Sequence, residues 1–171
     1  MRSFDTVIST RVLKIQKKQG SLMKLKALLA IFATIFAFAF TPAHADDMEV
    51  KRLAMQVSDN HDGTMTKVLN NAANFAAAMQ EAGYDYEIEI VAYNSGLHMF
   101  REDTSPVLER MKTFQQSVPN VTFSACGNTI KGMTKKAGGT PPPILDVVRV
   151  VPGGVVRLME LWEDGWFILR P

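Results

Sequence analysis

The sequence contains a single cysteine among its 171 residues. An internal disulfide framework and a metal site built only from cysteines are therefore excluded, because each needs at least two thiols. The sequence also lacks the two glycine-rich patterns that bind nucleotide phosphates, G-x-G-x-x-G after a strand and G-x-x-x-x-G-K-[ST]. It has no G-x-S-x-G motif of the kind that carries a catalytic serine. Nucleotide chemistry and serine hydrolysis lose support, which leaves the cysteine as the candidate for covalent chemistry.

The net charge of +2 for the full sequence comes from the first residues, and residues 46–171 have no excess of positive charge. Residues 1–26 hold seven of the 19 Lys and Arg but only one of the 17 Asp and Glu. Residues 46–171 carry the remaining 12 basic and 16 acidic side chains, a net charge of −4. No cluster of Lys and Arg interleaved with aromatic residues remains there, so nucleic acid is not expected as a partner.

The first 45 residues have the three parts of a secretory signal peptide. The basic stretch is followed by 14 almost entirely apolar residues, 27–40, and then by Ala43-His44-Ala45, a site that signal peptidase accepts. This apolar run is shorter than the roughly 20 residues that a membrane-spanning helix needs. We expect a signal peptide over residues 1–45, with Met1 or Met23 as the start, and a periplasmic mature protein without a membrane segment.

Residues 46–171 are expected to form a single α/β domain, because strand-like and helix-like patterns alternate along them. Strict alternation with short connections predicts a mainly parallel, five-stranded sheet with helices on both faces. The expected strands are residues 50–57, 86–93, 121–125, 147–151 and 166–169, and the expected helices are 65–82, 105–118, 130–136 and 155–164. Ligands gather at the carboxyl ends of such strands. The connections of interest are therefore residues 58–64, 94–104, 126–129 and 152–154.

Cys126 is the strongest candidate for chemistry. It directly follows the expected strand 121–125 and precedes Gly127-Asn128-Thr129, close to the start of a helix. A helix N-terminus favours negative charge, so a thiol placed there can act as a thiolate. The alternative is a structural cysteine, since cysteine is among the most buried residue types. His98, on the connection after the second strand, is either a partner that polarises the thiol or a surface histidine.

His61 lies between Asp59-Asn60 and Asp62-Gly63, a pattern that suggests a metal site. An EF-hand frame with Gly63 at its glycine position puts Ser58 and Leu69 at the first and last ligand positions, which excludes a calcium loop. A transition-metal site would need further ligands, and the alternative is a solvated connection between a strand and a helix. The sequence predicts no metal and no cofactor.

Four segments resemble the DsrE/DsrF-like family of intracellular sulfur-relay proteins. They are residues 67–75 (KVLNNAANF), 121–129 (VTFSACGNT), 150–166 (VVPGGVVRLMELWEDGW) and 167–171 (FILRP), and the resemblance spans residues 48–171. It implies a flavodoxin-like α/β fold with five strands, and homo-oligomers that are commonly trimers or hexamers. In sulfur-carrying members a cysteine after a central strand holds a persulfide and passes the terminal sulfur onward, and Cys126 matches that position.

The resemblance also implies a pocket around this cysteine. Asn128 and Thr129, with Asn94 and Gly96 from the neighbouring connection, would shape it. Independently of the resemblance, Gly127 beside Cys126 would let backbone N–H groups closely approach a sulfur-bound or anionic species. The family is mostly cytoplasmic, whereas this chain carries an export signal, so an exported member would not meet the usual cytosolic partners.

The resulting prediction is a periplasmic persulfide carrier whose sulfur donor or acceptor is a protein or a small sulfane-sulfur compound. One alternative is a non-catalytic binding module that uses the same crevice for a small ligand or a protein. Another is a metal or redox accessory protein that uses His61, His98 and Cys126.

Overall fold

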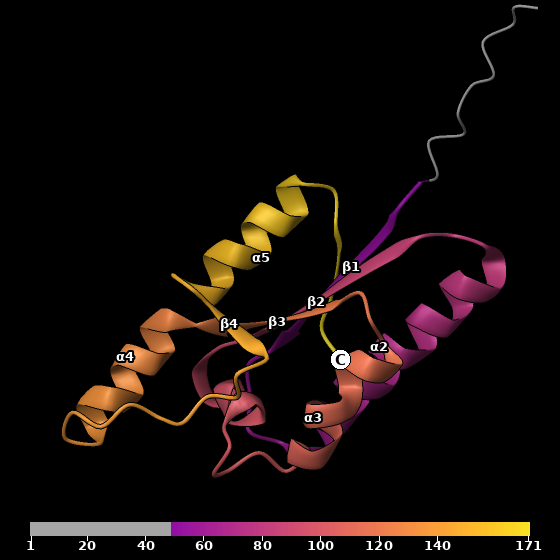
Figure 1. Ribbon diagram of the computed structural model, residues 1–171. Coiled ribbons are helices and arrows are strands. Elements are labelled where there is room, and N and C mark those ends of the chain that lie inside the picture. Colours follow the sequence, from indigo (N-terminus) through magenta and orange to yellow (C-terminus); the bar gives the residue numbers. More distant parts are fainter. Residues whose placement is uncertain (1–48) are drawn as a thin grey trace, which may run out of the picture. The chain divides into compact units, whose positions relative to one another are not determined.

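The computed structural model describes residues 49–171, in which strands and helices alternate along the chain (Figure 1). The expected signal peptide, residues 1–45, lies outside the described residues. The strands are β1 (Lys51–Val57), β2 (Tyr86–Ala92), β3 (Val121–Cys126), β4 (Val148–Val151) and β5 (Phe167–Leu169). The helices are α2 (Asp62–Ala82), α3 (Leu108–Ser117), α4 (Gly127–Lys136) and α5 (Gly154–Glu163), with a 3₁₀ helix, η1 (Asn94–Phe100), after β2.

The five strands form one sheet in the order β4-β3-β2-β1-β5, and every neighbouring pair is parallel. This confirms the predicted α/β fold with a five-stranded parallel sheet. The architecture is flavodoxin-like in its parallel sheet and its helical layers. The strand order differs from the 2-1-3-4-5 order of flavodoxin itself, because here β1 lies between β2 and the last strand, β5.

Helices cover both faces of the sheet, as predicted. Figure 1 shows α5 on one side of the sheet, and α2 and α3 on the other. Alternate strand residues such as Leu53 and Ile88 pack with Leu69 of α2 and Phe114 of α3 in the larger hydrophobic core. On the opposite face, Ala54 and Val91 pack with Leu158 and Leu161 of α5 in a smaller core. Period-two alternation along each strand separates the two sets.

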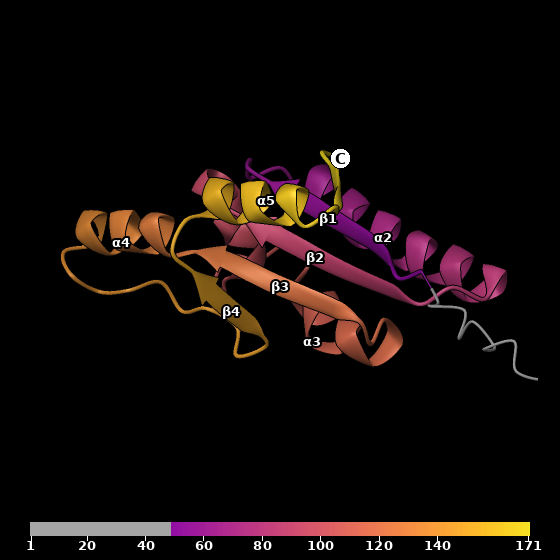
Figure 2. The same ribbon diagram turned by 90° about the horizontal axis from the view of Figure 1, so that it is seen from above.

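The connections that follow β3 and β4 turn to opposite faces of the sheet. Ile130 and Met133 of α4 pack against the larger core, whereas Leu158 and Leu161 of α5 form the smaller one. Crossovers between parallel strands are right-handed in about 98% of cases, so a chain that reverses its direction along the sheet moves its helix to the other face. The reversal occurs after β4, and in Figure 2 α4 extends past the end of β3. The carboxyl ends of β3 and β4 therefore flank the kind of crevice in which α/β proteins bind ligands.

The structure differs from the expected elements in four places. Helix α3 begins at Leu108 rather than at Ser105. Helix α2 begins at Asp62 rather than at Met65, and His61 is its N-cap, whose ring Nδ1 accepts a hydrogen bond of 3.2 Å from the Gly63 N–H. The connection after β2 contains the helix η1, where only a loop was expected. Helix α4 begins at Gly127, directly after β3, and not at Ile130. The histidine near the acidic residues thus has a capping role at the start of α2.

Candidate functional site

Cys126 occupies the position where β3 ends and α4 begins. It is the last residue of β3 and the N-cap residue of α4, and its side chain is 6% exposed. In the sheet it pairs with Val151, the last residue of β4. The connection from β4 to α5 therefore lies beside the thiol. Cys126, the residue that the sequence singled out for chemistry, thus lies at the crevice between the ends of β3 and β4.

Burial raises the pKa of the Cys126 thiol, but hydrogen-bond donors around the sulfur outweigh this effect and lower the pKa below its ordinary value. The groups responsible are the hydroxyl of Thr129 and the backbone N–H groups of Gly154, Thr129 and Asn128, which lie near the sulfur without forming a regular capping hydrogen bond to it. Two of these N–H groups belong to the first turn of α4, and the Gly154 N–H belongs to the first residue of α5. Both helix N-termini favour negative charge, so the site stabilises a thiolate.

Thr129 is held in place by the backbone of the neighbouring connection. The Asn94 N–H donates a hydrogen bond of 3.0 Å to the Thr129 Oγ1, so the hydroxyl hydrogen is left for the sulfur of Cys126. Asn94 has a φ of 49°, in the left-handed region, and is the one non-glycine residue with positive φ in the described chain. Asparagine tolerates this conformation better than most residues. The connection after β2 thereby contributes to the environment of the thiol.

Two glycines allow close backbone approach near the site. A Cβ at Gly154 would lie 2.8 Å from the Cβ of Tyr93, so glycine lets the first turn of α5 pack directly against Tyr93 beside the cleft. A Cβ at Gly96 would lie 2.2 Å from the carbonyl oxygen of Val57, so only glycine lets η1 pack directly against the end of β1.

The thiol lies in a cleft of about 870 Å³ between α4, α5 and η1. The α4 side contributes Lys136, and Arg101 adds a second cation that forms an ion pair with Asp103. The α5 side contributes Val155 and Val156, both more than half exposed. The cleft therefore combines two helix N-termini, basic side chains and an apolar wall, which suits a small anion or a thiol-bearing segment.

Five of the seven sequence-predicted site residues line this cleft: Asn94, His98, Cys126, Asn128 and Thr129. Gly96 and Gly127 lie behind it, where their backbones pack against Val57 and Val151. His98 shares the cleft, but its Nδ1 lies 2.8 Å from the Thr104 Oγ1, and it is not among the groups that lower the pKa of the thiol.

Sequence reasoning identified the connection at 152–154 but assigned no role to Gly154, the donor that it contributes. The Gly153-Gly154 pair shortly after an apolar strand could have indicated this donor, because glycines there leave the backbone N–H groups of a helix N-terminus open to a ligand. The Val155-Val156 wall and the cations Arg101 and Lys136 were missed as well. These side chains come from α5, α4 and the residue after η1, and only the paired strands bring these segments together.

Metal ligation gains no support from the described residues. Within residues 49–171 there is no group of three or more His, Cys, Asp or Glu side chains that could hold a metal ion, and His61, His98 and Cys126 form none. In the same range no helix has the length and apolar character to cross a bilayer.

Comparison with known proteins extends the evidence for the fold. No protein-family model matches the chain, and no curated protein matches it. Among solved structures it is similar to "Protein of Unknown Function MTH1491" from Methanobacterium thermoautotrophicum, with a TM-score of 0.60 and 25% sequence identity. The match covers 71% of this chain and 99% of that protein. The similarity supports the α/β fold.

Proposed function

We propose that the protein carries a persulfide on Cys126 and passes its terminal sulfur to a partner thiol. The observation that carries this proposal is the convergence of two helix N-termini and the Thr129 hydroxyl on one cysteine. A thiolate is the nucleophilic form of cysteine, and a lowered pKa increases its population at neutral pH. The resemblance of residues 121–129 to sulfur-carrying proteins supports the same role.

The reaction consists of two thiolate displacements. In the first, the Cys126 thiolate attacks the outer sulfur of a donor R–S–SH, the donor's S–S bond breaks, and R–S⁻ leaves with the electron pair while Cys126–S–SH forms. In the second, an acceptor thiolate R′–S⁻ attacks the terminal sulfur of this persulfide, which yields R′–S–SH and restores the Cys126 thiolate. The sulfane sulfur changes carrier, and no external oxidant or reductant is needed.

The residues around Cys126 assist both steps. The N–H groups of Gly154 and Asn128 and the hydroxyl of Thr129 stabilise the thiolate that attacks in the first step and leaves in the second. Lys136 in the cleft favours the approach of an anionic sulfur compound, whereas the charge of Arg101 is balanced by Asp103. The donor is accordingly a small sulfane-sulfur compound or a protein persulfide, and the acceptor is a small-molecule or protein thiol.

We place this activity in the periplasm, because residues 1–45 have the pattern of a secretory signal peptide. Fractionation of cells that express the full chain tests this placement. We expect the protein in the periplasmic fraction, shortened to begin at Asp46. Full-length protein in the cytoplasm would contradict the placement.

Mass spectrometry after incubation with inorganic polysulfide tests the persulfide. We expect the protein to gain sulfur on Cys126, to lose it on treatment with dithiothreitol, and to transfer it to an added low-molecular-weight thiol. The matched control is Cys126→Ser, which removes the only thiol of the chain and is expected to gain none. A folded wild-type protein that gains no sulfur under conditions that label an established persulfide carrier would overturn the proposal.

The low exposure of Cys126 favours a second candidate, a non-catalytic module that binds a ligand or a protein in the same cleft. At 6% exposure the thiol has little contact with solvent. Alkylation with iodoacetamide separates the two functions. A carrier reacts in its folded state, whereas in a binding module Cys126 is alkylated only after unfolding in urea.

We also propose that the protein forms a homo-oligomer, a trimer or a hexamer, as the resemblance implies. An exposed apolar stripe on α5, formed by Val155, Val156, Met159 and Trp162, supports this assembly because soluble monomers rarely expose such a continuous patch. Sedimentation velocity is expected to give an oligomer for the wild type and a smaller species for Trp162→Glu. A monomeric wild type would contradict the assembly.

A further inference from the structure

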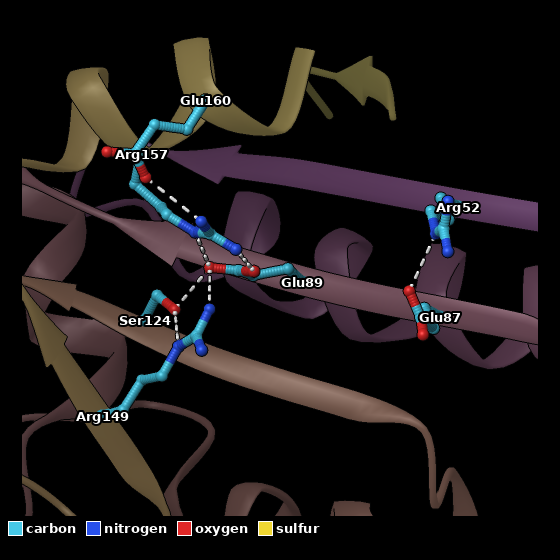
Figure 3. Close-up of polar contacts among 7 residues, drawn as sticks. All are labelled: Arg52, Glu87, Glu89, Ser124, Arg149, Arg157 and Glu160. Carbon is cyan, nitrogen blue, oxygen red and sulfur yellow. Dashed lines mark hydrogen bonds and ion pairs between the residues drawn. The ribbon is translucent and has the colours of Figure 1, made fainter. Parts of the chain in front are cut away.

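A buried carboxylate lies under α5, away from the cleft. Glu89 of β2 is 2% exposed and accepts hydrogen bonds from three side chains (Figure 3). Arg157 of α5 binds it through two nitrogens, with Nε 2.9 Å from Oε1 and Nη2 2.8 Å from Oε2. Arg149 of β4 adds an ion pair of 2.8 Å, and the Ser124 hydroxyl of β3 donates at 2.6 Å. We call these four residues the Glu89 cluster.

The cluster connects four elements on this face of the sheet, β2, β3, β4 and α5. Ser124 lies two residues before Cys126 on β3, so the two side chains lie on the same face about 7 Å apart along the strand. Arg149 lies on β4, just before the connection to α5. Arg157 lies three residues after Gly154, about one turn further along α5. The connection that presents the Gly154 N–H is therefore held on both sides by one carboxylate.

We propose that the Glu89 cluster is a positioning device that holds the first turn of α5 against the sulfur of Cys126. The proposal rests on the proposed function, because a persulfide carrier needs a stabilised thiolate. Without the cluster, the smaller core of Leu158 and Leu161 would fix the distance of α5 from the sheet, but it is not directional. The two-nitrogen contact of Arg157 fixes rotation and translation of the helix as well.

The chemistry of the cluster also argues against a purely stabilising role. Burying a carboxylate carries a desolvation cost, and a well-packed apolar group often gives equal or greater stability at such a position. The neighbouring positions on this face, Ala54 and Val91, are apolar and buried. The carboxylate therefore supplies what an apolar group lacks, which is a fixed direction for Arg157.

Titration of Cys126 in the variant Glu89→Gln tests the proposal. The absorbance of the thiolate near 240 nm is followed against pH, with the Cys126→Ser protein as the blank for the tyrosines. The chain has one cysteine, so the signal has one source. We expect the pKa of Cys126 to rise and the thiolate fraction at pH 7 to fall by about three- to tenfold, as expected when one of its donors is weakened.

The direction of the change separates positioning from simple charge effects. Removal of a negative charge on its own favours a nearby thiolate and lowers the pKa of Cys126. Loss of the Gly154 donor raises it. A fall in the pKa, or no change in a folded Glu89→Gln protein, would overturn the proposal.

Two further variants complete the test. Arg157→Lys keeps the positive charge but loses the two-nitrogen contact, so it is expected to raise the pKa of Cys126 even if Glu89→Gln fails to fold.

Glu87→Gln is the matched control, because Glu87 lies on the same strand and face but forms an exposed ion pair with Arg52 (Figure 3). We expect wild-type titration for this control, and a rise equal to that of Glu89→Gln would overturn the proposal. Because the titration involves no sulfur transfer, its outcome is independent of whether Cys126 carries a persulfide.

Discussion

The two faces of the sheet are held by different kinds of interaction. On the face covered by α2 and α3, the buried strand residues are aliphatic or aromatic, from Leu53 on β1 to Val148 on β4. On the face covered by α5, the buried strand residues include Glu89 and Ser124 beside Ala54 and Val91. Burial of apolar area stabilises a fold without specifying a direction, whereas the hydrogen bonds of Glu89 specify one.

The thiol of Cys126 lies on the face of the sheet that α5 covers, the face with buried polar side chains. Cys126 shares that face with Ser124, and one of the groups that lower the pKa of its thiol, the Gly154 N–H, belongs to α5. We infer from this comparison that the two faces have different roles. The face covered by α2 and α3 contributes most of the free energy of unfolding, and the face covered by α5 fixes the geometry of the site. Four tests examine this division, in order of decreasing effect on the free energy of unfolding.

The largest effect is expected for Phe123→Ala on the α2 face. Phe123 is fully buried, with its ring centroid 5.7 Å from that of Phe100 and 6.2 Å from that of Phe114. Truncation of a buried phenylalanine costs about 3–5 kcal/mol. Urea denaturation measures the loss, and Phe123→Leu, which keeps most of the volume, is expected to lose about 1 kcal/mol. A loss for Phe123→Ala smaller than that for Glu89→Gln would reverse the comparison.

Glu89→Gln is expected to cost less, about 2 kcal/mol, because Arg149 is half exposed and Arg157 regains some solvent when the charge is removed. The loss should depend on pH. Burial raises the pKa of Glu89, but hydrogen bonds from Arg157, Ser124 and Arg149 outweigh it and lower the pKa below its ordinary 4.5.

The sign of this pH dependence follows from the lowered pKa. A carboxyl group whose pKa is lower in the folded state stabilises the protein above its unfolded pKa, and that contribution is lost as the pH falls through the folded value. The wild type should therefore lose free energy of unfolding more steeply below pH 4.5 than Glu89→Gln does. Equal acid slopes in urea denaturation would show that the carboxylate is not stabilised as the geometry indicates.

This cluster also marks the limit of prediction from the sequence. The alternating run at residues 86–93 located β2 within one residue, because alternation of polar and apolar residues is typical of a strand. The same pattern places Glu87 and Glu89 alike on the polar face. Their different burial depends on α5, whose Arg157 lies 68 residues away along the chain.

The candidate site divides in the same way. Cys126, Asn128 and Thr129 are close in sequence, and the order of strand and helix was enough to group them. Asn94 lies in the connection 94–104, which the predicted parallel sheet brings to the same edge because parallel strands end together. The contribution of Gly154 depends on the pairing of Cys126 with Val151 and on the reversal of chain direction after β4, and neither is visible in local patterns.

Two glycines that differ in their surroundings give the third test. Gly154→Ala would place a Cβ 2.8 Å from the Cβ of Tyr93, and we expect a loss of about 1–2 kcal/mol from overpacking, with a raised pKa for Cys126. Gly132, within α4, has no atom within 4 Å of an added Cβ, so Gly132→Ala should stabilise by about 0.5–1 kcal/mol. Thermal unfolding measures both, and stabilisation by Gly154→Ala would contradict the close approach of α5.

The smallest effect is expected for Glu87→Gln, which removes an ion pair of the same chemistry from the same strand and face. The side chains of Arg52 and Glu87 are 41% and 49% exposed, against 2% for Glu89. Exposed pairs contribute little, so the loss should be below about 0.5 kcal/mol and should vanish in 1 M salt. The difference between Glu87→Gln and Glu89→Gln then measures what burial and the arginine contacts add to one carboxylate. If urea denaturation gave equal losses for both, the Glu89 cluster would be another surface ion pair, and α5 would depend on its apolar contacts alone.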